Sequence, residues 1–391
     1  MSRTARFIDI HVVQPVPYSN LNRDDTNSVK SVLFGDTLRT RVSSQSWKRA
    51  IREHFQDALG DKALRTRRIG ERVAEALHRE HGWGEDEAAR AGAHVAAGSS
   101  IKYEIAKGAD KKAIPNKVLT NALLYLPESA VAELAELCVE HRAAIKGDFD
   151  GKKLDSALPK KTIDEIFRRK NGVIQLFGRM LAEVDNAEVD GAVQVAHAFT
   201  THTTEIELDY FSAVDDVTEA KNDATGSGHM GTNEYSAGTF YRFATVDLDE
   251  LTKNLERDSA DQAAARSLVR QFLLSFISSL PQAKKNSTAP HTVPHLAHIA
   301  VRSDRPLSFA AAFEEPVKSP TDGGFTQKSS AGLDSYANTV NTLMGSDNLL
   351  CAAYAGVDVD KIEHLGERHT GFASLVDAVV EAAMPAAEAP Q

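Results

Sequence analysis

A cationic helix that directly follows an extended stretch, within residues 38–55, is the strongest constraint on what this chain can form. At 100° per residue its apolar side chains fall on one arc and its cations on the opposite arc: Trp47, Ala50, Ile51 and Phe55 against Lys48, Arg49 and Arg52. Ser43 or Ser44 is placed to cap the helix, so free backbone N–H groups, hydroxyls and the positive end of the helix dipole are expected beside the cations. This chemistry is typical of a phosphate site. A solvated cationic face on an ordinary surface helix is the equally weighted alternative.

The net charge of the chain does not exclude an anionic partner, because the charges are segregated. The formal net charge is −10, and a uniformly acidic protein would repel nucleic-acid phosphates. Residues 1–56, however, carry nine Lys and Arg against five Asp and Glu, which leaves 36 against 50 for the other residues. Residues 1–56 therefore have a formal net charge of +4, and the other residues have one of −14. A local positive field favours an anionic ligand at the basic helix.

Composition predicts an ordinary globular protein. The chain has 391 residues, 42% of them hydrophobic and 26% charged, enough for one large or two modest cores. We find no apolar run long enough to cross a bilayer and no signal peptide, and we expect a cytoplasmic protein without a membrane partner. Cys138 and Cys351 lie far apart, so neither a disulfide framework nor a thiolate metal site is expected.

Hydrophobic periodicity predicts an α+β fold. Outside two insertions, the pattern runs strand, helix, strand, strand, helix, strand, which is the ferredoxin-like β-α-β-β-α-β order shared with the RNA-recognition module. The first insertion, about residues 61–186, is predicted to be helical, and the second is a polar hairpin extension between the two middle strands. The strands are expected at residues 7–13, 193–202, 239–246 and 296–301, and the second helix at 262–280. A helix near 334–344, a strand at 349–354 and a helix at 372–383 follow.

Several motifs that suggest a cofactor or metal are rejected. Residues 226–231 match G-x-G-x-x-G, but acidic and polar residues precede them and an aromatic strand follows, whereas a dinucleotide site needs a buried strand before and a helix after. His291, His295 and His298 are interrupted by prolines and lack an interleaved carboxylate or cysteine. We therefore predict no cofactor and no metal site.

Catalysis has little support in the sequence. The acidic pairs Asp24-Asp25 and Asp215-Asp216 are each adjacent on an extended chain, so their carboxylates point opposite ways and cannot form a dyad within one pair. Asp24 is equally suited to accept a hydrogen bond that fixes the loop of Arg23. No G-x-S-x-G elbow is present. We predict a protein that is not an enzyme and has no catalytic residue.

Several blocks of residues resemble the CasC-type backbone subunit of the type I-E CRISPR Cascade complex. They follow the family order along most of the chain, and the block around the basic helix is long enough to be specific. The blocks are His11, residues 21–25, 34–35, 41–46 with 48–50, 178–180, 189–192, 196–202, 211–216, 238–242 and 323–325.

The resemblance implies a hand-shaped subunit that polymerises along CRISPR RNA, together with further copies of itself and other Cascade subunits, and presents the guide to target DNA. Its palm is RNA-recognition-like, its fingers are helical and its thumb is a long hairpin that kinks the guide at regular intervals. The aromatic motifs of an RNA-recognition sheet are not evident here, so contacts to the RNA backbone are expected instead. The implied division is palm 1–60, fingers 61–190, palm strand 191–208, thumb 209–238, and palm with C-terminal packing elements 239–391.

The resemblance also implies site residues. Guide phosphates are expected at the palm residues Arg23, Lys30, Ser43, Gln45, Lys48, Arg49 and Arg52 and at the loop residues Lys284 and Lys285. A kinked nucleotide is expected against the finger residues Gly178, Arg179 and Met180. The thumb wedge is expected at Tyr210, Phe211, Val214 and Met230, with Tyr210 standing where some relatives have tryptophan. Two alternatives stay open: a backbone subunit that also cleaves target RNA with a loop aspartate and a divalent metal, and a free RNA-binding regulator.

Overall fold

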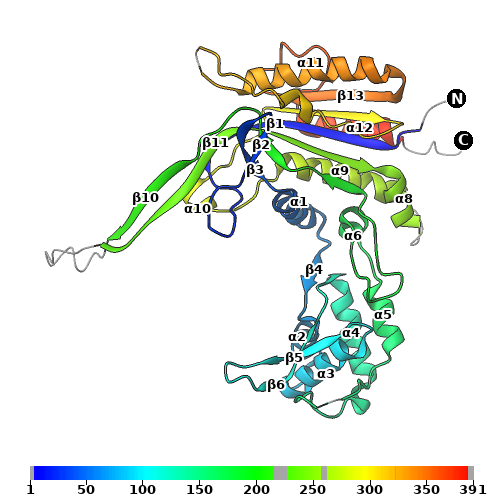
Figure 1. The fold of residues 1–391 in the computed structure, drawn as a ribbon. Coiled ribbons are helices and arrows are strands. Elements are labelled where there is room, and N and C mark those ends of the chain that lie inside the picture. Colours follow the sequence, from blue (N-terminus) through cyan, green and yellow to red (C-terminus); the bar gives the residue numbers. More distant parts are fainter. Residues whose placement is uncertain (1–3, 153, 215–226, 257–261, 322, 386–391) are drawn as a thin grey trace, which may run out of the picture. The chain divides into compact units, whose positions relative to one another are not determined.

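The computed structural model describes residues 4–152, 154–214, 227–256, 262–321 and 323–385 (Figure 1). It divides into two compact units. The first, here called the sheet unit, comprises Met1–Phe55, Val193–Asp249 and Ala260–Gln391. The second, the insert unit, comprises Gln56–Ala192 and Glu250–Ser259. Among the described residues, no helix combines the length and apolarity that a bilayer crossing requires.

The sheet unit is built on one large sheet with the strand order β14-β13-β12-β1-β11-β9-β3-β2, to which β8 and β10 add by pairing with β11. Neighbouring strands are antiparallel, except for β13 and β14. The strands are β1 Phe7–Ser19, β2 Ser31–Phe34, β3 Thr37–Val42, β8 Val193–Val195, β9 Ala198–Thr200, β10 Glu207–Val214, β11 Ser227–Asp247, β12 Leu296–Arg302, β13 Leu349–Gly356 and β14 Glu367–Arg368.

Helices cover both faces of this sheet, with α11 on one face and α9 and α12 on the other (Figure 1). The helices that lie wholly or partly in the sheet unit are α1 Ser44–Leu59, α8 Leu248–Glu256, α9 Gln262–Ser278, α10 Lys285–Thr288, α11 Thr326–Met344 and α12 Phe372–Ala383, with 3-10 turns at Ala310–Phe313 and Ser346–Asn348. α1 and α8 each run from one unit into the other.

The central strand β1 is buried on both faces, because layers pack above and below it. Its side chains alternate between the two cores, as a period of two requires. His11 stacks on Phe309 at 4.2 Å between ring centroids, within the layer that α11 covers. Gln14 instead receives a hydrogen bond of 2.6 Å from Arg242. The strand predicted at residues 7–13 is therefore present and longer than its pattern indicated.

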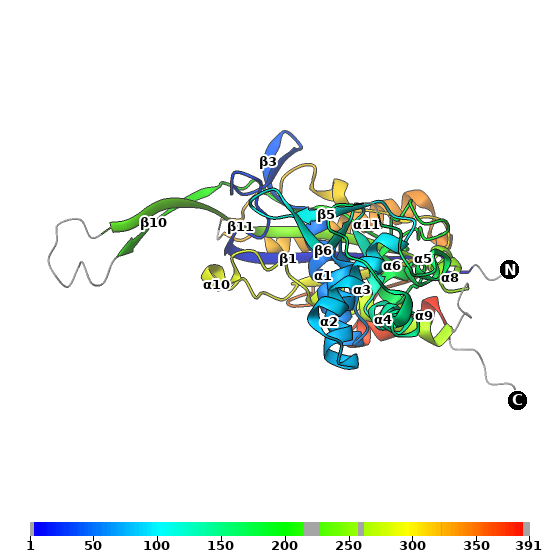
Figure 2. The same ribbon diagram turned by 90° about the horizontal axis from the view of Figure 1, so that it is seen from below.

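A two-stranded extension, β10 with β11, projects from the sheet unit in both views (Figures 1 and 2). The register runs from Glu207 opposite Tyr235 to Val214 opposite Ser227. β11 then continues into the large sheet as one strand and pairs with β1, with a register shift between Val16 and Ser19. For Val214 and Met230 the structure describes the backbone but not the side chains, and Asp215 and Asp216 lie outside the described residues.

The insert unit is not purely helical, which corrects the prediction for residues 61–186. Two small antiparallel sheets accompany its helices, β4 with β7 and β5 with β6. Their partners are separated by turns or whole helices, so a local helical period could not indicate them. The elements are β4 Ala63–Thr66, α2 Ile69–His81, α3 Glu85–Gly98, β5 Tyr103–Lys107, β6 Ala113–Thr120, β7 Leu124–Pro127, α4 Ser129–Glu140, a 3-10 turn at Arg142–Ala144, α5 Lys160–Phe167 and α6 Gly172–Phe177.

The strand predicted at residues 193–202 is interrupted. β8 pairs with β11 through Val195 opposite Ala244, and β9 pairs with it through Phe199 opposite Tyr241. The four residue steps from Val195 to Phe199 therefore lie opposite only three steps of β11, from Ala244 to Tyr241. One extra residue on one strand is the signature of a β-bulge. Ala196 and His197 occupy the bulge, outside either strand. An extended stretch before α1 was predicted and is present as β3, but its pairing with β2 in a hairpin was not predicted.

Candidate nucleic-acid interface

The amphipathic helix predicted in residues 43–55 is present as α1 and separates its faces as expected. Trp47, Ile51 and Phe55 are buried in the core. On the outer face, Arg49 keeps 76% of its side chain exposed and forms an ion pair of 2.8 Å with Glu53. An exposed pair of this kind contributes little to stability, so Arg49 remains available to an anion. Gln45 is exposed on the first turn, and Lys48 and Arg52 are half-buried.

Ser43 caps the N-terminus of α1, as predicted, but other amides that were expected to be free there are bonded within the protein. The hydroxyl of Ser43 accepts a hydrogen bond of 3.3 Å from the N–H of Ser46. The N–H of Ser44 donates to Nδ1 of His197 over 3.0 Å. Ser43 is itself buried, and its N–H donates to Oδ1 of Asn22 over 2.8 Å. Two of the first amides are thus consumed internally, so a phosphate at this point has to be bound mainly by side chains.

A groove of about 320 Å³ joins α1 to two of the predicted loops. Ser46, Arg49, Ala50 and Glu53 supply the helix side of the groove. Leu21 comes from the loop that leads to Arg23, and residues 281–283 come from the loop that leads to Lys284. The tertiary structure therefore brings α1 together with the two segments that lead to Arg23 and Lys284, although of the predicted phosphate-binding residues only Arg49 is in the groove lining.

Arg23 and Lys284 lie near one another, at the base of the β10–β11 extension. Partial burial and then the charge of Arg23 lower the pKa of Lys284. Nζ of Lys284 donates to Oδ1 of Asn233 and lies 5.2 Å from the ring centroid of Tyr235. The ammonium of Lys284 is thus partly used within the chain. Lys285, on α10, is exposed, and Lys30 is half-buried.

Asp24 holds the loop of Arg23 in place. Its Oδ1 accepts hydrogen bonds from the N–H and hydroxyl of Thr26, at 2.9 and 2.7 Å, and from the N–H of Ser28, at 2.9 Å. These bonds, that of the Thr26 hydroxyl first, lower the pKa of Asp24 below its ordinary value. Arg23 donates in turn to Oδ1 of Asn27 over 2.5 Å. One oxygen of the carboxylate, Oδ1, therefore fixes the turn.

The insert unit places Gly178, Arg179 and Met180 in very different surroundings. Gly178 has a positive φ of 78°, and a Cβ there would lie 2.8 Å from the backbone N of Gly191. Arg179 is 4% exposed, and its guanidinium donates to the carbonyl oxygens of Ala187, Arg169, Arg168 and Tyr125. Burial lowers its pKa to about 10. Met180, in contrast, is 87% exposed. Of the three, only Met180 has an exposed side chain, while Arg179 secures the turn that precedes it.

Met180 lies on the rim of a hollow of about 410 Å³. Leu123, which is 56% exposed, and Tyr125 line the same hollow. The guanidinium carbon of Arg65 lies 4.4 Å from the ring centroid of Tyr125. Leu123 and Arg65 were not predicted, because each is an isolated residue of a common type in a segment expected to be helical.

The described part of the predicted thumb wedge is exposed on β10. Tyr210 is 63% and Phe211 38% exposed. Phe211 faces Gly231 across the two strands, where a Cβ would lie 2.8 Å from Cζ of its ring. The missing side chain at residue 231 therefore leaves the space that the ring of Phe211 occupies.

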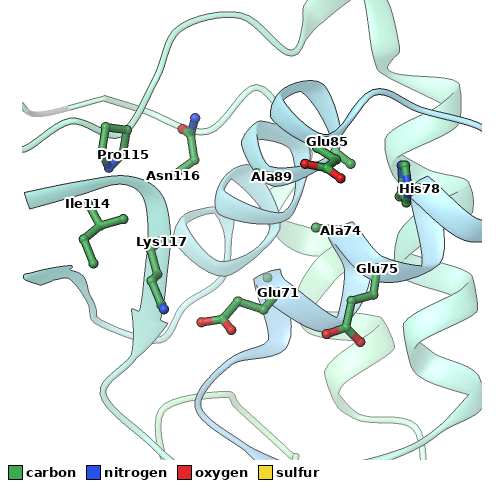
Figure 3. Close-up of a pocket in the computed structure, with 12 residues that line it drawn as sticks. Glu71, Ala74, Glu75, His78, Glu85, Ala89, Ile114, Pro115, Asn116 and Lys117 are labelled. Atoms are coloured by element: carbon green, nitrogen blue, oxygen red, sulfur yellow. The ribbon is translucent and has the colours of Figure 1, made fainter. Parts of the chain in front are cut away.

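A further groove of the insert unit has the wrong charge for phosphate. It measures about 420 Å³, lies between α2, α3 and β6, and carries the carboxylates of Glu71, Glu75 and Glu85 beside His78 and Lys117 (Figure 3). Its lining includes none of the predicted RNA-binding residues. We therefore exclude it from the candidate interface.

The CT1975-like protein family has a model that matches residues 8–381 of the chain. The chain belongs to the CT1975-like family. No curated protein sequence matches it significantly.

Two solved structures resemble the CT1975-like protein over nearly its full length. One, a chain of a "CRISPR RNA-guided surveillance complex, pre-nicking", is 44% identical with a TM-score of 0.87 and covers 96% of this chain and 100% of its own. The other, from a "CRISPR RNA-guided surveillance complex", is 40% identical with a TM-score of 0.77 and covers 96% and 99%. The family resemblance drawn from the sequence blocks is thereby confirmed, as is the α+β class. The individual RNA-binding assignments in this CT1975-like protein stay predictions.

Proposed function

We propose that this CT1975-like protein is the non-catalytic backbone subunit of a type I-E CRISPR surveillance complex. Copies of it polymerise along the CRISPR RNA, bind other Cascade subunits and present the guide to target DNA. Sequence is then read by base pairing, and the protein contacts only backbone and shape. The observation that carries the proposal is the groove on α1, where Arg49 lies beside the segments that lead to Arg23 and to Lys284. The two similar chains from RNA-guided complexes support it.

We infer that the sheet unit is a ferredoxin-like palm. The antiparallel order β12-β1-β11-β9 supports this, because it places the first, second, third and fourth strands of a β-α-β-β-α-β chain in the spatial order 4-1-3-2. α1 follows the first strand, and α9 precedes the fourth. The insert unit then forms the fingers and the β10–β11 extension the thumb.

The basic helix is tested by the salt dependence of RNA binding. Lys48→Ala combined with Arg52→Ala is expected to weaken guide binding for every sequence and to reduce the slope of log K against log salt by about 0.7 for each lost phosphate contact. The exposed lysines Lys328 and Lys361, replaced together by alanine, provide a matched control. An unchanged slope in the first variant would remove α1 from the interface.

The thumb kinks the guide by wedging the apolar groups of Tyr210, Phe211, Val214 and Met230 between nucleotides. Base stacking of this kind contributes roughly 1–3 kcal/mol per base and does not depend on base identity. Replacing residues 210–232 by an Asn-Gly turn shortens the extension at the pair Asp209 and Asn233. The variant is expected to fold and to bind a short RNA, but not to assemble on a long one. Normal assembly on a repeat-derived RNA, seen as a large nuclease-protected particle, would refute the thumb assignment.

Absence of catalysis is tested with the assembled complex, complementary RNA and Mg²⁺. The proposal predicts intact RNA. Regularly spaced cuts that disappear on Asp24→Ala or Asp215→Ala would instead establish the RNA-cleaving alternative. The structural role of Oδ1 of Asp24, which holds the turn, supports the non-catalytic proposal.

A further inference from the structure

His197 is held in one protonation state by two donors that converge on the same ring nitrogen. The N–H of Ser44 lies 3.0 Å from Nδ1 of His197, and Nη1 of Arg41 lies 3.2 Å from it. Neither a backbone amide nor a guanidinium accepts a hydrogen bond, so Nδ1 must carry the lone pair. The ring proton of the neutral imidazole is therefore on Nε2.

The surroundings of His197 keep the ring neutral. Partial burial, then the charge of Arg41 and then that of Lys30 lower its pKa below the ordinary value. Protonation would place a proton on Nδ1, which would break the contact with Ser44 and repel Arg41. A neutral ring among cations keeps its acceptor toward α1 and turns its single donor away from it.

The backbone at His197 is shaped to present this ring. His197 and Ala196 form the β-bulge between β8 and β9, and bulges re-aim a side chain that regular pleating would direct elsewhere. The side chain is exposed. Among the described residues, none has a hydrogen bond with Nε2 of His197.

We infer that His197 is a further RNA-binding residue of this protein, whose Nε2–H donates to a phosphodiester oxygen of the guide beside Arg41 and Lys30. The inference rests on the proposed function and adds a neutral donor to its cationic groove. It also explains how a helix N-terminus whose first amides are capped can still meet the RNA: His197 accepts from Ser44 on one side and donates to phosphate on the other.

Two substitutions separate the donor from the cap. His197→Asn places an amide near the position of Nδ1, so the cap of Ser44 is kept and the outward donor is lost. His197→Gln reaches the position of Nε2, so the donor is kept and the cap is lost. A purely structural histidine predicts normal RNA binding for His197→Asn and impaired binding for His197→Gln, the reverse of our inference.

Binding is measured with the full chain and a short fluorescein-labelled single-stranded RNA of mixed sequence, by anisotropy at several salt concentrations. His197→Asn is expected to weaken binding about tenfold, as for the loss of one hydrogen bond to a charged group, with an unchanged thermal midpoint. The slope of log K against log salt is also expected to stay unchanged, because a neutral donor releases no counterion. His197→Gln is expected to bind nearly as the wild type and to melt earlier.

His364→Asn, an exposed histidine in the loop before β14 at the opposite edge of the sheet, is the matched control and is expected to bind normally. Wild-type affinity in His197→Asn would overturn the inference while leaving the proposed function intact. If His197→Asn reduced the slope of log K against log salt by about 0.7, His197 would bind the phosphate as a charged imidazolium, and the neutral donor would be refuted. A wild-type protein that does not bind the RNA would instead refute the proposed function.

Discussion

Arg242 lies flat against Trp47, with its guanidinium carbon 3.8 Å from the ring centroid. The same guanidinium lies 4.6 Å from the ring centroid of Phe276 on α9 and donates to Gln14 on β1. Burial lowers the pKa of Arg242 to about 9. This cation–π stack fastens α1, and hence the cationic face that α1 presents, to the central strands. The position of the proposed RNA-binding face therefore depends on a buried pair that never contacts RNA.

Loss of the stack should unfold the sheet unit more easily. Trp47→Ala removes a fully buried indole and leaves Arg242 without its ring, so we expect a loss of about 3–5 kcal/mol in the free energy of unfolding. Urea denaturation measures it. Gln45→Ala, at an exposed position of the same helix, should change the stability by less than about 0.5 kcal/mol. Similar stabilities of the two variants would contradict the anchoring role of the stack.

Asp9 should make stability depend on pH. Burial raises the pKa of its carboxyl from 3.8 to about 7, although Oδ2 accepts a hydrogen bond of 2.8 Å from the N–H of Leu307. The folded protein thus binds this proton more tightly than the unfolded chain. The stabilising contribution of protonated Asp9 is complete below about pH 4 and is lost as the pH rises to about 7, roughly 4 kcal/mol at most.

Asp9→Asn isolates this effect. Burial lowers the pKa of His11 and of His298, so these histidines act in the opposite direction below about pH 6.5. The difference in unfolding free energy between wild type and variant is therefore the quantity to follow. As the pH rises from about 4 to about 7, the unfolding free energy of the wild type should fall relative to that of Asp9→Asn. A constant difference across that window would show that Asp9 titrates as an ordinary carboxyl.

Arg179 and Met180 are adjacent but should respond oppositely. Arg179→Met leaves four carbonyl oxygens without their donor, and we expect a loss of about 3 kcal/mol in the stability of the insert unit. Met180→Ala should change stability by less than about 0.5 kcal/mol, since the side chain is exposed, but should weaken binding to a guide RNA. Chemical denaturation and RNA titration of both variants test the pair. Reduced RNA affinity of a fully stable Arg179→Met would show that Arg179 contacts RNA itself.

Gly231 and Phe211 should be coupled. A Cβ at residue 231 would approach the ring of Phe211 to 2.8 Å, so Gly231→Ala must displace the ring. The substitution should lower RNA affinity in the wild type and have little effect in a Phe211→Ala background, which gives a non-zero interaction energy in a double-mutant cycle. Additive effects would mean that the ring of Phe211 is not positioned by Gly231.

Local periodicity was sufficient for the amphipathic helices, in which one face meets the core and the other meets solvent. α1 follows from the spacing of Trp47, Ile51 and Phe55, and α12 begins and ends at the predicted residues 372 and 383. The strand predicted at residues 296–301 is β12, which ends one residue later, whereas the strand predicted at 7–13 continues to Ser19. The two small sheets of the insert unit were missed, because strand pairing joins residues that are distant in sequence.

The cationic face of α1 was determined by the sequence alone, because helical spacing decides which side chains share a face. Which groups remain available on that face was decided only by the tertiary structure. The N–H of Ser44 is bonded to His197, a residue 153 positions away. The guanidinium of Arg179 is buried and donates to four backbone carbonyl oxygens, one of them that of Tyr125. Hydrogen bonds between distant segments depend on how the layers pack, and no residue spacing within one segment records them.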